Sequence, residues 1–150
     1  VWYRDSLHLF SKNRLQQGNY YTVHYVVPAE PGDYVAIRRD SLYLKKRVVT
    51  AAAISPDGQA LALLSYYFKA WLGFIPVTRT SVFLLEDFPE GRFLKGRLRR
   101  YRVPKGLMPT QYEAADFLDE QSLLVASERT ILFRQQARRL RIERRSGDPP

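Results

Sequence analysis

Histidines are the scarcest side chains in this sequence that transfer protons or bind metals. The 150 residues contain two, His8 and His24, and no cysteine. Both lie in apolar, β-prone segments joined by a polar loop near Leu15 and Gln16, so a hairpin would let them face each other on neighbouring strands. Zinc takes three or four protein ligands, so this pair by itself predicts two partly buried strand residues rather than a metal site.

Arginines are far more abundant and could bind phosphate. Lys and Arg number 24 against 15 Asp and Glu, a net charge of +9, which favours an anionic surface as a partner. Phosphate binding by such a surface would be independent of sequence and weakened by salt. The alternative is that the charges only protect edge strands from pairing with another chain. The candidate basic surface consists of Arg97, Arg99, Arg100, Arg102, Arg139 and Arg141.

An aromatic, apolar stretch at residues 66–76 is the strongest candidate for binding another protein. It is expected to form a long loop between two apolar strands, and because loops are usually polar, this one must pack on something. Aromatic side chains are enriched in the cores of protein interfaces, so we expect a protein partner or self-association, unless the loop folds back over its own strands. Its candidate binding residues are Tyr66, Tyr67, Phe68, Trp71 and Phe74.

Motifs for covalent or phosphate chemistry do not occur in the sequence. It has no Gly-x-Ser-x-Gly, no phosphate-binding glycine loop and no His-Glu-x-x-His. We therefore expect no cofactor, and a binding protein more than an enzyme. No run of 18 apolar residues occurs, so no membrane span is expected either. The sequence indicates no particular cellular compartment.

The segments that must position these residues are organised around residues 48–86. An apolar run ends at Ser55-Pro56-Asp57-Gly58, where proline fixes φ and Asp-Gly supplies the left-handed residue that reverses the chain. Two further apolar runs follow, residues 60–64 and 82–85. This order predicts consecutive antiparallel strands of one small sheet.

A degenerate internal repeat extends this pattern over the chain. Residues 5–11, 59–65 and 121–127 align, and the segments upstream of the last two also match. The match predicts strands in residues 111–125, although Ala, Leu, Glu and Gln there would also allow a helix. Four strands per unit, with apolar inner strands and a charged last strand, are typical of a propeller blade.

The predicted fold is all-β, with about two and a half four-stranded antiparallel blades forming an open or partial β-propeller. A single β-repeat domain is expected over residues 1–145, and its first unit is expected to lack an inner strand. A β-sandwich, and a mixed α+β fold with a helix near residues 111–125, are the alternatives. The expected units and tail are 1–47, 48–109, 110–145 and a disordered 146–150.

Two stretches resemble known bacterial propellers. Residues 54–63, Ile-Ser-Pro-Asp-Gly-Gln-Ala-Leu-Ala-Leu, resemble the strand–turn–strand of TolB-like and WD-like propellers. Residues 112–117, followed by 123–128, are similar to blades of phytase-like and esterase-like propellers. Propellers have about four to eight blades, so the chain is expected to be a fragment of a longer protein or an open module that closes by self-association.

The resemblance implies a non-catalytic propeller segment that acts as a scaffold for protein interactions. An alternative that it also implies is part of a propeller hydrolase with calcium in its channel, for which Glu113 and Glu128 are weak ligand candidates. The simpler interpretation is that these are turn and strand-end carboxylates paired with arginines. A third hypothesis is a polyanion-binding surface formed by the basic residues.

Overall fold

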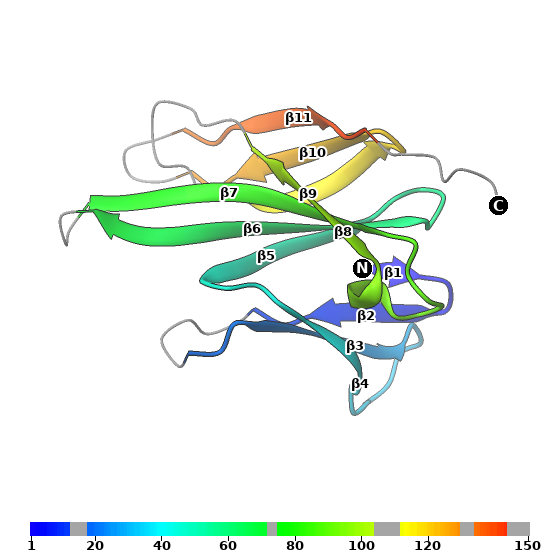
Figure 1. Ribbon diagram of the computed structural model, residues 1–150. Helices are drawn as coiled ribbons and strands as arrows, with labels where there is room; N and C mark the ends of the chain where they lie inside the picture. Colours follow the sequence, from blue (N-terminus) through cyan, green and yellow to red (C-terminus); the bar gives the residue numbers. More distant parts are fainter. Residues whose placement is uncertain (13–17, 72–74, 104–111, 130–133, 144–150) are drawn as a thin grey trace.

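The strands of this protein form three antiparallel sheets that follow one another along the chain (Figure 1). The structure is a computed structural model, which describes all residues except 13–17, 72–74, 104–111, 130–133 and 144–150, and the side chains of 68–71 and 75–78. Sheet 1 contains β1 (Trp2–Tyr3), β2 (Ser6–Phe10), β3 (Tyr21–Pro28) and β4 (Ile37–Tyr43). Sheet 2 contains β5 (Arg47–Ile54), β6 (Ala60–Trp71), β7 (Ile75–Glu86) and β8 (Arg97–Arg102). Sheet 3 contains β9 (Tyr112–Asp119), β10 (Ser122–Ser127) and β11 (Ala137–Arg141).

Each sheet is a meander in which neighbours in sequence pair in space, as in a propeller-like blade. The prediction of an all-β protein with about two and a half such units is confirmed by sheets of four, four and three strands. The prediction of strands within residues 111–125 is confirmed by Tyr112–Asp119 and Ser122–Ser127, which excludes the alternative of a helix there. The expectation that the first unit lacks an inner strand is wrong, because β1 pairs with β2.

The boundaries expected for the repeat units each enclose one sheet, except that Arg47, the first residue of β5, falls in the first unit. A short 3-10 helix, η2 (Phe93–Lys95), lies between β7 and β8 and packs against β4 of sheet 1. The predicted disordered tail, 146–150, lies outside the described residues. The single-domain organisation stays a prediction.

The middle sheet buries both of its faces, because side chains alternate along a strand. On β6, Leu61 and Leu63 belong to a cluster shared with sheet 1 that includes Phe93. Ala62 and Leu64 point the other way, into a cluster shared with Leu123 and Val125 of sheet 3. Figure 1 shows the result as three layers with sheet 2 in the middle. This arrangement explains why its inner strands are apolar at consecutive positions over residues 60–64 and 82–85.

The Ser55–Gly58 turn forms as predicted and connects β5 to β6. The Ser55 hydroxyl accepts a hydrogen bond from the Ala60 N–H at 2.9 Å, and Asp57 accepts one from the Gln59 N–H at 3.0 Å. Gly58 has φ +69°, in the left-handed region that glycine adopts without strain. A Cβ atom there would lie 2.7 Å from the ring of Tyr3, so the turn is also in close contact with sheet 1.

Within the aromatic stretch, residues 66–71 and 75–76 form a hairpin arm and not a long loop. β6 ends at Trp71 and β7 begins at Ile75. The two strands are paired over their whole length, from Ala60 with Glu86 to Trp71 with Ile75. The loop prediction was wrong because polarity was expected to mark the strand ends. Tyr, Phe, Trp and Val are strong strand formers, and they extend the ladder instead.

Candidate functional site

The outer face of sheet 1, turned away from sheet 2, is apolar and exposed. Strand pairing places Trp2 opposite Leu7, Leu9 opposite Tyr25 and Tyr21 opposite Tyr43, and residues paired in this way share one face. Trp2, Leu7, Leu9, Tyr21 and Tyr43 are 40–67% exposed, and the other apolar residues of this face are half-buried. Arg38 and Ser41 of β4 lie on the same face. The residues of this outer apolar face are Trp2, Leu7, Leu9, Tyr21, Val23, Tyr25, Val27 and Tyr43.

The inner face of sheet 1 carries a buried polar chain. His8 Nδ1 lies 2.8 Å from His24 Nε2, and His24 Nδ1 lies 3.0 Å from Asp40 Oδ1. Since a carboxylate accepts hydrogen bonds, His24 donates from Nδ1. Asp40 Oδ2 accepts a further bond from the Leu94 N–H at 3.2 Å, which links sheet 1 to η2. The Phe93 ring packs over both imidazoles.

His8 is neutral at pH 7, because its pKa lies well below that value. Burial, and then the neighbouring His24, lower the pKa of His8 to about 4, while a hydrogen bond with the Tyr3 backbone opposes the shift. The predicted contact between the histidines is confirmed, but the register pairs His8 with Val26 and His24 with Phe10. The two rings therefore meet diagonally. In the part of the chain that the structure describes, no group of three or more His, Asp or Glu side chains is arranged to hold a metal ion.

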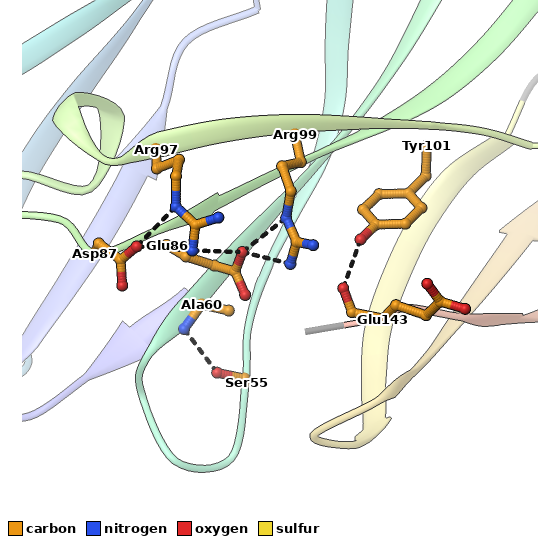
Figure 2. A network of polar contacts seen from close by, with 8 residues as sticks. All are labelled: Ser55, Ala60, Glu86, Asp87, Arg97, Arg99, Tyr101 and Glu143. Carbon is orange, nitrogen blue, oxygen red and sulfur yellow. Dashed lines mark hydrogen bonds and ion pairs between the residues drawn. The ribbon is translucent and has the colours of Figure 1, made fainter. Parts of the chain in front are cut away.

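The arginines of β8 divide between the two faces of sheet 2, because their side chains alternate. On the face toward sheet 3, Arg97 Nε donates to Asp87 at 2.8 Å, and Arg99 donates from Nε and Nη2 to Glu86 Oε2 at 2.9 and 2.6 Å. Figure 2 shows both arginines directed at these carboxylates, with the Tyr101 hydroxyl donating to the Glu143 carbonyl beside them. Arg97 and Arg99 are thus neutralised by acidic partners.

The opposite face of sheet 2 carries Arg100 and Arg102, near Arg47 of β5. Arg100 Nε donates to Ser81 Oγ at 3.1 Å, and Arg47 Nη1 donates to Ser65 Oγ at 3.4 Å. Arg47 is buried, with 8% of its surface exposed, whereas Arg100 and Arg102 are exposed. We call Arg47, Arg100 and Arg102 the arginine cluster. Arg47 stands directly before an apolar strand, and this position is the feature of the sequence that points to it. Its burial depends on packing and could not be predicted.

The basic residues of β11 lie on sheet 3, apart from those of β8 in the sequence and in the sheet order. Arg139 Nη2 donates to Asp119 Oδ2 at 3.0 Å and to Ser122 Oγ at 2.8 Å. An open hollow of about 610 Å³ at this edge presents both signs of charge, so it does not favour anions alone. Its lining residues are Asp119, Glu120, Gln121, Ser122, Arg139 and Arg141.

The remaining candidates are only partly placed. Tyr66 and Tyr67 are half-buried on β6, opposite Thr80 and Arg79 of β7. The side chains of Phe68, Trp71 and Phe74 lie outside the described residues.

Glu113 and Glu128 come to the same end of the β9–β10 ladder, next to the Tyr112–Ser127 pair, with Glu113 half-buried and Glu128 exposed. Their role as metal ligands stays a hypothesis.

Comparison with family models, with curated proteins and with solved structures finds no match for this chain. Within the described residues, no helix is long and apolar enough to cross a membrane. We therefore infer the function from the geometry of sheets 1 and 2.

Proposed function

We propose that this chain is a segment of a bacterial-type β-propeller, similar to TolB-like and WD-like propellers, that acts as a non-catalytic scaffold for protein interactions. The observation that carries the proposal is the outer apolar face of sheet 1. Monomeric proteins rarely expose a contiguous apolar patch larger than a few hundred Å². Here exposed Trp, Leu and Tyr side chains gather on one sheet face, from β1 to β4.

The two terminal sheets of the stack differ in their free faces. On sheet 3, Asp116, Leu124 and Arg139 form one row across the three strands, so that face carries charges of both signs. On the corresponding face of sheet 1, the row Trp2, Leu7 and Val27 is apolar, and the row Leu9, Tyr25 and Arg38 carries a single charge. Water solvates the charged side chains on the face of sheet 3 better than the apolar side chains on the face of sheet 1. We therefore assign binding to the face of sheet 1.

The occupant that fits this face is another apolar sheet face, and we assign it to a second copy of the chain. The stacking of sheet 1 on sheet 2 and of sheet 2 on sheet 3 demonstrates that this chain buries apolar sheet faces against one another. Pairing the outer apolar face with itself gives a closed two-fold dimer, the commonest form of self-association.

Light scattering over a range of protein concentrations tests the proposal. Wild-type protein should be dimeric at high micromolar concentration. The double variant Leu7→Thr, Leu9→Thr replaces exposed apolar residues with a strand-forming polar one, so it should weaken dimerisation about tenfold or more while the melting temperature stays near that of the wild type.

Leu118→Thr is the matched control, since Leu118 is an exposed leucine on β9 of sheet 3, with 52% of its surface exposed. It should leave dimerisation unchanged. A wild-type protein that stays monomeric, or an equal effect of the control and the double variant, would refute the proposed interface.

A further inference from the structure

The arginine cluster is assembled from both edges of sheet 2. Ser65 of β6 and Ser81 of β7 are paired, and Arg102 of β8 pairs with Ser81, so their side chains share one face. Arg100 pairs with Phe83, one step further along the same face. From β5, Arg47 donates to Ser65 Oγ at 3.4 Å, while Arg100 donates to Ser81 Oγ at 3.1 Å. Two guanidinium groups therefore converge from opposite sides on neighbouring serines.

The surroundings of the cluster disfavour its positive charge. The guanidinium of Arg47 does lie over the ring of Phe83, 5.4 Å from its centre, a cation–π contact that favours its charge. Burial first, and then the charges of Arg100 and Arg102, lower the pKa of Arg47 to about 10, with Tyr67 acting in the opposite direction. A buried arginine held beside two like charges gains stability from any anion that enters the cluster.

The two faces of β8 show that acidic partners are placed selectively. Arg97 and Arg99 pair with Asp87 and Glu86 on one face. Across the residues that the structure describes, Arg100 and Arg102 take part in no ion pair. Both are exposed, so a ligand from solution reaches them.

We propose that Arg47, Arg100 and Arg102 form a binding site for a phosphate group, with the buried hydroxyls of Ser65 and Ser81 positioning Arg47 and Arg100 from behind. Guanidinium groups donate hydrogen bonds in a planar fork that matches phosphate oxygens, and such charge-assisted bonds are the strong ones. A phosphate group carries about −1.5 to −2 charges near pH 7 and accepts bonds on three oxygens. It matches three arginines better than a carboxylate, which has one charge and two oxygens. The site takes either free phosphate or a phosphate monoester.

Thermal unfolding in inorganic phosphate tests the site, with sodium chloride at equal ionic strength as the reference. Phosphate should raise the melting temperature of the wild type in a saturable way, because a ligand that binds only the folded state stabilises it. The double variant Arg100→Gln, Arg102→Gln should bind phosphate at least about tenfold more weakly, since it loses charge-assisted bonds. Glycerol 3-phosphate serves as the monoester. If glycerol 3-phosphate raises the melting temperature as much as phosphate does, the site also binds phosphate monoesters. If it causes no shift, the site binds only the free ion.

The matched control is the double variant Arg139→Gln, Arg141→Gln, which also removes two arginine charges, but from β11 of sheet 3. It should retain the phosphate shift of the wild type. If the Arg100, Arg102 double variant does not fold, Arg102→Gln alone replaces it, because Arg102 is exposed and its loss should still weaken binding several-fold. No shift in the wild type, or equal shifts in the cluster and control variants, would overturn the proposal.

Discussion

At the scale of single residues, the polar groups of this protein are distinguished by the face on which they lie. His24 and Asp40 are buried and bonded to each other on the inner face of sheet 1, while their strand neighbours on the other face are exposed or half-buried. Arg99 and Arg100 are adjacent in the sequence, yet one is paired with Glu86 and the other lies beside like charges. The alternation of side chains along a strand thus decides which charges are available to a ligand.

His8 should make the protein sensitive to acid. Its pKa is lowered to about 4 in the folded state, against about 6.5 in the unfolded chain. Below pH 6.5 the unfolded state binds a proton that the folded state does not, so stability falls as the pH decreases from 6.5 toward 4. The loss should approach roughly 2–3 kcal/mol at pH 4. Urea unfolding at a series of pH values measures it.

The variant His8→Gln is the control for this effect, because it keeps a polar side chain without a titrating group. Its stability should fall less steeply between pH 6.5 and 4 than that of the wild type. Parallel pH profiles for the two proteins would show that His8 is not the group responsible.

At the scale of the elements, the strands could be predicted from the sequence and their lengths and contacts could not. The internal repeat predicts strands in residues 111–125, although the local helix propensity is high. The repeat is the better guide because its pattern of apolar residues reflects burial in a sheet. The arm of β6 and β7 was missed, since nothing local marks where a ladder of β-prone residues ends. The His8–His24 contact follows from one hairpin, whereas Asp40 and Arg47 acquire their roles from the packing of one sheet on the next.

The turn between β5 and β6 should tolerate little change. Gly58→Ala adds a methyl group at φ +69° and 2.7 Å from the Tyr3 ring, so it should cost about 1–3 kcal/mol from backbone conformation and the clash together. Gly91→Ala is the matched control, with φ +66° and open space around the added atom. Thermal unfolding should rank the wild type above Gly91→Ala and Gly91→Ala above Gly58→Ala. Equal losses in the two variants would mean that the Tyr3 contact contributes nothing.

At the scale of the whole molecule, three sheets are stacked and the two ends of the stack are unlike. Sheet 2 is covered on both faces, by Phe93 and its neighbours on one side and by sheet 3 on the other. Sheet 3 ends the stack with a row of mixed charge, and sheet 1 ends it with an apolar, aromatic face. The proposed scaffold function depends on this asymmetry, while the arginine cluster on sheet 2 is independent of it.

Trp2 reports most directly on whether the outer apolar face is covered in solution. The chain has two tryptophans, so Trp71→Phe leaves Trp2 as the only one. Its side chain is 67% exposed on the outer face of sheet 1, where a second copy would bury it. We predict that Trp2 fluorescence in this variant is blue-shifted and protected from acrylamide at high protein concentration, and becomes red-shifted and quenchable on dilution. Emission that is red-shifted and fully quenchable at every concentration would contradict the proposed interface.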